Sequence, residues 1–151
     1  MNPDYIALEW VKGEIQETLN QAQIALEEFA EKPSDESALT ICRGALHQVH
    51  GTLQMVEFYG AALLAEEMEA AAMALAEKRI ASVQDGMEVL MQAIIQLPYY
   101  LEHVKVGRRD LPVVLLPILN ELRSVRGESL LSETALFSPY IEHNPNLSQG
   151  L

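Results

Sequence analysis

The sequence predicts an all-α protein, an antiparallel four-helix bundle with an additional C-terminal helix. Three observations predict this class. Apolar residues recur in steps of three and four along almost every segment of the 151 residues. Short connections join four long apolar seams, as in a bundle of neighbouring antiparallel helices. Finally, 49% of the residues are hydrophobic but only 6% are aromatic, which suits a helical bundle better than a β-rich fold.

The first two predicted helices have clear ends. The first has its apolar seam over residues 8–29 and ends before Pro33. Ser34 or Asp35 can then cap the second helix, because their side-chain oxygens accept hydrogen bonds from free backbone N–H groups. The second helix repeats apolar residues over 39–56 with a period of about 3.5 residues.

A third helix is predicted over residues 64–75, after Gly60 marks a short turn or a tight continuation of the chain. Its apolar positions face the core in this prediction. Glu66, Glu67 and Glu69 fall between them, so we expect these acidic side chains to form a solvated face.

The fourth and fifth predicted helices both contain proline. The fourth covers residues 82–104 and begins at Ser82, and Pro98 within it is expected to kink or split the helix. The fifth covers residues 112–123, with Pro112 in its first turn and Pro117 interrupting it. Everything beyond Gly127 has the composition of a loop.

Charge and composition limit the partners and the location. The net charge of −12 argues against nucleic acid and anionic lipid as partners. The single cysteine, Cys42, excludes an internal disulfide framework and fits a reducing compartment. The chain contains no long uncharged apolar run and no basic, apolar leader, so we expect no membrane insertion and a cytoplasmic protein. Residues 1–126 are predicted to form the bundle and residues 127–151 a C-terminal tail or linker.

The second predicted helix carries one stripe without large apolar side chains, which consists of Gly44, His47, Gly51 and Gln54, with His50 beside it. His47 is therefore expected to face solvent. A glycine inside a helix costs about 0.5–1 kcal/mol relative to alanine, so two glycines beside one histidine need a reason. The close approach of a partner backbone to the imidazole is such a reason.

The chemistry of this stripe suits a phosphoryl carrier. A neutral imidazole is a competent nucleophile toward a phosphoryl group. In this interpretation His47 accepts the phosphoryl group and His50, one turn along, is its electrostatic neighbour. Gly44, Gly51 and Gln54 would contact the partner protein.

Two other kinds of site are argued against. One helical turn places His47 and His50 within reach of a single metal ion, but no third ligand is evident nearby because Cys42 lies on the core seam. We therefore expect no metal. The sequence has no Gly-rich phosphate loop, so we also expect no ATP site, no cofactor and no autonomous enzyme.

The segment His47-Gln48-Val49-His50-Gly51-Thr52 resembles the His-x-x-Lys-Gly-Ser/Thr motif of histidine-containing phosphotransfer (Hpt) domains. Residues 8–15, 51–69 and 115–123 are similar to the N-terminal domain of chemotaxis-type hybrid histidine kinases of the ChpA/PilL kind, which control type IV pili and twitching motility. The likeness covers roughly residues 5–135. It extends to FimL-like proteins, stand-alone relatives that lack the phosphorylatable histidine and act by binding proteins.

This resemblance implies an Hpt-type bundle in a chemosensory two-component system, with His47 accepting a phosphoryl group from a kinase catalytic domain or a response-regulator receiver domain. His50 replaces the usual lysine, which weakens the stabilisation of phosphate. Glu57 replaces a second glycine and adds repulsion toward an acidic receiver surface. The alternative is a phosphotransfer-inactive, FimL-like scaffold that docks a response regulator or a polar landmark protein. The sequence leaves open whether the chain takes part in catalysis as the phosphotransfer domain of a kinase.

Overall fold

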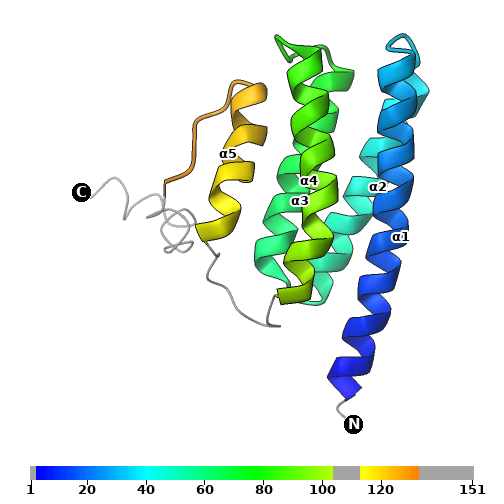
Figure 1. The fold of residues 1–151 in the computed structure, drawn as a ribbon, viewed down its shortest axis with the longest axis vertical. Coiled ribbons are helices and arrows are strands. Elements are labelled where there is room, and N and C mark those ends of the chain that lie inside the picture. The colour runs from blue at the N-terminus through cyan, green and yellow to red at the C-terminus, as the bar shows by residue number, and fades with distance from the viewer. Residues whose placement is uncertain (1–2, 104–112, 133–151) are drawn as a thin grey trace.

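The computed structural model describes residues 3–103 and 113–132, with side chains from residue 9 onward. The described part is helical throughout its regular structure (Figure 1). Its elements are α1 (Pro3–Glu31), α2 (Glu36–Met55), α3 (Tyr59–Ala76), α4 (Val83–His103), the short 3-10 turn η1 (Val113–Leu115) and α5 (Leu116–Val125).

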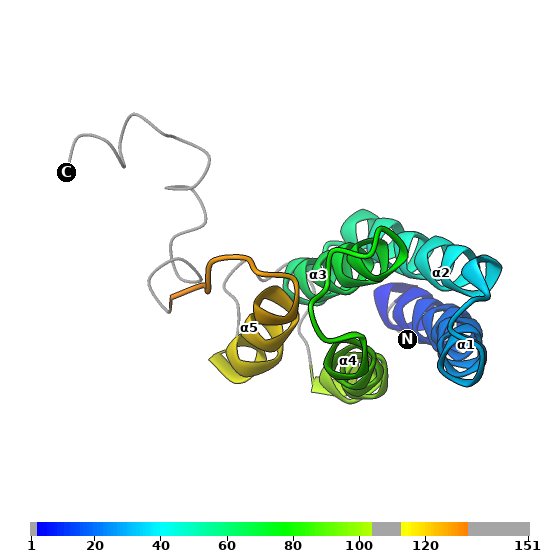
Figure 2. The same ribbon diagram turned by 90° about the horizontal axis from the view of Figure 1, so that it is seen from above.

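The helices alternate in direction along the chain, so α1 to α4 form an antiparallel bundle (Figure 1). Helix α2 packs most extensively, against α1 on one side and α3 on the other. Helix α5 lies outside this group and packs against α3 and α4, as Figure 2 shows from above. The predicted fold class, an all-α bundle with an additional C-terminal helix, is confirmed.

The predicted seams form the core. Buried side chains line α1 at steps of three and four, and those of α2 and α4 follow the same rule. Helix α3 is different, because buried residues occur on most sides of it. Many of these residues are alanines, whose small side chains allow neighbouring helices to approach closely. Cys42 lies in this core, and burial raises the pKa of its thiol to about 12.

The boundary between α1 and α2 follows the prediction. Asp35 is the N-cap of α2, and its carboxylate accepts a hydrogen bond from the backbone N–H of Ser37 at 3.2 Å. The next boundary lies earlier than Gly60. Helix α2 ends at Met55, Glu57 adopts a left-handed φ of 64°, and Gly60 is buried within the first turn of α3. Gly60 therefore belongs to the helix, and the turn precedes it.

The two proline predictions have different outcomes. Helix α4 continues through Pro98, so the proline does not split it, and the alternative of a kink stays a prediction. Pro117 lies in the first turn of α5 and does not interrupt that helix, because backbone N–H groups there have no partner within the helix. Pro112 lies outside the described residues.

Residues 127–132 contain no helix, and Gly127 has a φ of 76° just beyond α5. This short segment turns back along α5, since the side-chain amide of Asn120 bonds both the N–H and the carbonyl of Leu131, at 2.7 and 3.0 Å. Residues 133–151 lie outside the described part, and the division into a bundle of residues 1–126 and a tail of residues 127–151 stays a prediction. Within the described residues, no helix is both long and apolar enough to span a membrane.

Candidate functional site

The stripe predicted on the second helix lies on the exposed side of α2. Gly44, His47, Gly51 and Gln54 are all exposed, and the His47 side chain keeps 74% of its surface. A Cβ atom added at Gly44 or Gly51 would meet nothing within 4 Å. The prediction that His47 faces solvent is therefore confirmed, and bare backbone flanks it on both sides. We refer to these four residues as the α2 stripe.

The helical repeat explains this placement. Leu46, Val49 and Leu53 are buried and form the face of α2 that packs against α1 and α3. His47 follows Leu46 by one position, which turns its side chain about 100° around the helix toward solvent. His47 therefore leaves the core while Leu46 stays in it. His50 comes three residues later, nearer the buried seam, and its side chain is only 19% exposed.

Two carboxylates from α3 approach these histidines. Oε2 of Glu69 lies 2.9 Å from Nδ1 of His47, and Oε1 of the same carboxylate lies 3.5 Å from Nδ1 of His50. Glu66 contributes an oxygen 3.9 Å from Nε2 of His50, beyond hydrogen-bonding distance. Nε2 of His50 is itself buried and has no hydrogen-bond partner. We call these four residues the His–Glu cluster.

The cluster corrects one step of the sequence-based reasoning. His47 and His50 do have a third potential metal ligand nearby, because His47, His50 and Glu69 each offer an atom within 4.8 Å of the others. The sequence contains two matching spacings that could have suggested the cluster, His-x-x-His on α2 and Glu-x-x-Glu on α3. Spacing alone does not say which face α3 turns toward α2, so only the packing of the two helices brought them together.

The predicted solvated acidic face of α3 is wrong at Glu67. This side chain is buried, and its two oxygens lie 2.6 Å from Nη1 of Arg123 and Nη2 of Arg126. Both arginines come from the C-terminal end of α5 and the residue after it. No local spacing could indicate this pairing, because the partners are 56 and 59 residues away from Glu67. The two ion pairs join the C-terminal end of α5 to α3.

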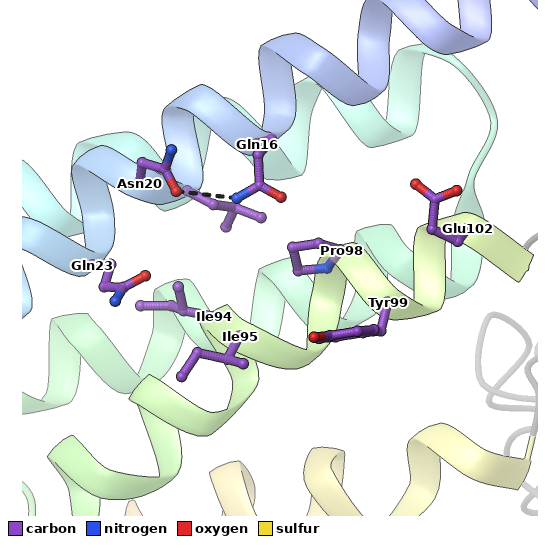
Figure 3. Close-up of a pocket in the computed structure, with 9 residues that line it drawn as sticks. Gln16, Asn20, Gln23, Ile94, Ile95, Pro98, Tyr99 and Glu102 are labelled. Carbon is purple, nitrogen blue, oxygen red and sulfur yellow. Dashed lines mark hydrogen bonds between the residues drawn. The ribbon is translucent and has the colours of Figure 1, made fainter.

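A hollow of about 360 Å³ lies elsewhere in the bundle, between α1 and α4 (Figure 3). Gln16, Asn20 and Gln23 of α1 face Ile94 and Pro98 of α4 across it, and Gln16 donates a hydrogen bond to Asn20 at 3.0 Å. Its lining consists of amides, apolar groups, the phenol of Tyr99 and the carboxylate of Glu102. These groups form neither a nucleophile–base pair nor a metal-ligand set. The His–Glu cluster, where α2 meets α3, is therefore the better candidate for a functional site.

Comparison with known proteins places the chain in a family. The family model described as the FimL C-terminal domain matches residues 6–128, which include all five helices from the second turn of α1 onward. The chain belongs to the FimL C-terminal domain family. Scaffold protein FimL of Pseudomonas aeruginosa is 34% identical over 140 residues, which cover 90% of the chain and 24% of that protein. The chain thus spans about a quarter of the length of this curated relative. No solved structure matches the chain.

Proposed function

We propose that this chain is a protein-binding scaffold domain of a cytoplasmic chemosensory system that controls type IV pili and twitching motility. It docks a response-regulator receiver domain or a polar landmark protein through the α2 stripe. Membership of the FimL C-terminal domain family supports the scaffold role, as does the likeness to a relative named as a scaffold protein. The observation that carries the choice of surface is the exposed, backbone-open stripe itself.

The physical properties of the stripe suit docking. Gly44 and Gly51 expose helix backbone at a cost of about 0.5–1 kcal/mol each, and no neighbouring side chain in the described structure needs the space. Ile41 and Met55 border the stripe on the same helix, with 56% and 85% of their surface exposed. A partner that covers these apolar side chains gains their burial, and methionine adapts readily to a partner's shape.

Paired glycine substitutions test this surface. The variant Gly44→Ala with Gly51→Ala places two methyl groups where the partner would approach, and we expect at least about a tenfold loss of affinity for the receiver domain or the landmark protein. Gly13→Ala is the matched control, since Gly13 is also an exposed helical glycine with nothing within 4 Å, but it lies on α1. Isothermal titration calorimetry with each purified partner gives the affinities.

Both variants should also fold more stably, by about 0.5–1 kcal/mol per glycine replaced, because alanine is the better helix former. A loss of binding by the paired variant alone therefore reports on the surface and not on folding. If the paired variant and Gly13→Ala bind both partners as tightly as the natural chain, the α2 stripe is not the docking surface.

One contact favours phosphotransfer at His47 as a second candidate function. The carboxylate of Glu69 holds Nδ1 of His47 at 2.9 Å, which makes Nδ1 the protonated nitrogen and leaves the lone pair on Nε2. That nitrogen could attack the phosphorus of an aspartyl phosphate on a receiver domain. A nitrogen–phosphorus bond would form, the bond between phosphorus and the aspartate oxygen would break, and the carboxylate would be released.

Incubation of the chain with a phosphorylated receiver, or with the cognate kinase and radiolabelled ATP, tests this second function. Acid-labile label on the natural chain and its loss in His47→Gln would establish the transfer. Absence of label on the natural chain would exclude it with these donors and leave the scaffold function standing, because docking requires no phosphoryl group.

A further inference from the structure

The geometry of the His–Glu cluster points to a metal site: we propose that His47, His50 and Glu69 bind one divalent transition-metal ion of the zinc class. Glu66 supports the site from its edge. Two imidazoles and a carboxylate are ligands that zinc takes in open sites, where a water molecule or a group from a bound protein completes the coordination. The high exposure of His47 leaves room for such a fourth ligand.

The distances are close to those that an ion imposes. Metal–ligand bonds of about 2.0–2.1 Å in a tetrahedral site place ligand atoms about 3.4 Å apart. Oε2 of Glu69 lies 2.9 Å from Nδ1 of His47, and the other oxygen of this carboxylate, Oε1, lies 3.5 Å from Nδ1 of His50. One ligand atom from each of the three residues lies within 4.8 Å of the other two. Binding of one ion would therefore draw the three ligand atoms closer together.

The His50 ring lies between two carboxylates. Its Nδ1 faces Glu69 at 3.5 Å and its Nε2 faces Glu66 at 3.9 Å. A metal-binding histidine usually directs its second ring nitrogen to a carboxylate, which fixes the ring and strengthens the bond to the ion. His50 is placed for this pattern with Nδ1 toward the ion and Nε2 toward Glu66.

Charge and hydrogen bonding also favour a cation here. Two carboxylates meet two imidazoles in a chain whose net charge is −12, so a divalent ion would neutralise local negative charge. Nε2 of His50 is buried without a hydrogen-bond partner, which is costly for a polar nitrogen. Coordination would draw Glu66 close enough to accept its proton.

The ligand set also predicts selectivity. Imidazole suits zinc and its neighbours in the first transition row, whereas magnesium and calcium prefer sites made of oxygen atoms. We therefore expect Zn²⁺ to bind and Mg²⁺ not to compete with it. The untagged 151-residue chain, freed of metal with a chelator, would be titrated with zinc chloride in a calorimeter, with and without excess magnesium.

Single variants identify the ligands. His50→Gln and Glu69→Gln should each weaken zinc binding by at least about tenfold, in line with the loss of a ligand or its orienting partner. His103→Gln is the matched control, since His103 is an exposed histidine at the end of α4, far along the chain from the cluster. It should bind one equivalent of zinc as the natural chain does.

Circular dichroism and the melting temperature in the absence of zinc check that each variant folds. Absence of stoichiometric zinc binding by the natural chain would overturn the proposal, and so would equal binding by all variants. A further measurement separates this site from scaffold function, because docking of the partner can be assayed with and without chelator. Failure of docking in both conditions contradicts the scaffold proposal and leaves the metal site intact.

Discussion

The carboxylate of Glu67 lies inside the molecule, where an unpaired charge would be strongly unfavourable. Each of its oxygens receives a guanidinium nitrogen at 2.6 Å, from Arg123 and Arg126. Two cations beside one anion compensate its removal from water, and the arginine side chains remain 20% and 14% exposed. Glu67 is therefore a structural residue that joins two helices, while its neighbours Glu66 and Glu69 face the histidines.

Replacement of Glu67 should be costly. In Glu67→Gln the two guanidinium groups lose their anion, and we expect the free energy of unfolding to fall by about 3 kcal/mol, as when one partner is removed from a buried pair. Urea denaturation measures the change. Glu66→Gln, on the solvent side of the same helix, should change stability by less than about 0.5 kcal/mol. Equal effects of the two variants would contradict the structural role of Glu67.

Cys42 should be chemically inert in the folded protein. Burial raises the pKa of its thiol to about 12, so at about pH 8 the reactive thiolate is scarce and the sulfur is covered. We expect a thiol reagent to label the chain only at the rate of unfolding, and promptly in concentrated urea. A Cys42→Ala chain with Gln48→Cys on the exposed side of α2 is the control, and it should react at once. Comparable native rates would show that the core around Cys42 opens readily.

At the scale of the helix, one polar side chain caps the start of α2. The Ser37 hydroxyl, followed by the Ser37 and Ala38 backbone N–H groups, stabilises the charged Asp35 carboxylate and lowers its pKa below the ordinary value. The contribution to stability is therefore complete above the ordinary aspartate pKa of about 3.9, and it is lost as the pH falls through the lower folded-state value. The cap makes the start of α2 sensitive to acid.

Variants of Asp35 test the cap. Asp35→Ala should lower the melting temperature near neutral pH, and the difference from the natural chain should shrink as the pH falls below about 4. Asp35→Asn retains a side-chain acceptor but does not titrate, so its difference from Asp35→Ala should not depend on pH in this range. Melting curves followed by circular dichroism give both comparisons. A natural chain whose advantage persists unchanged in acid would show that the carboxylate charge is unimportant.

The existence of each helix followed from periodicity, whereas several helix ends and the neighbours of each helix did not. Apolar residues recur every three or four positions in α1, α2 and α4, with polar residues between them, so the sequence indicated which face of each helix is buried. Helix α3 is rich in alanine and buried on most sides, so its pattern did not say where Glu67 would point. The prolines were ambiguous for a related reason, because their effect depends on whether they fall in the first turn or the interior of a helix.

At the scale of the molecule, α5 is an integral part of the core. Leu115, Ile118, Leu119 and Leu122 are buried against α3 and α4, and Glu67 links the far end of α5 to α3. Apolar contact and paired charge therefore both hold the helix. We expect it to unfold with the bundle in one cooperative transition.

Leu119→Ala tests this cooperativity. The side chain is fully buried, so its truncation should cost about 2–5 kcal/mol across the whole domain. Hydrogen exchange should show amides of α3, α4 and α5 losing protection at the same denaturant concentration. Loss of protection in α5 alone would mean that this helix is a separately unfolding unit.

The sequence by itself determined the class of fold, the exposure of His47 and the glycine-flanked stripe around it, because these follow from a helical repeat that relates residues a few positions apart. Only the tertiary structure decided that Glu69 meets both histidines and that Glu67 turns inward to two arginines. The physical reason is that these contacts join different helices. They depend on the rotation and height at which helices pack, which no local spacing records.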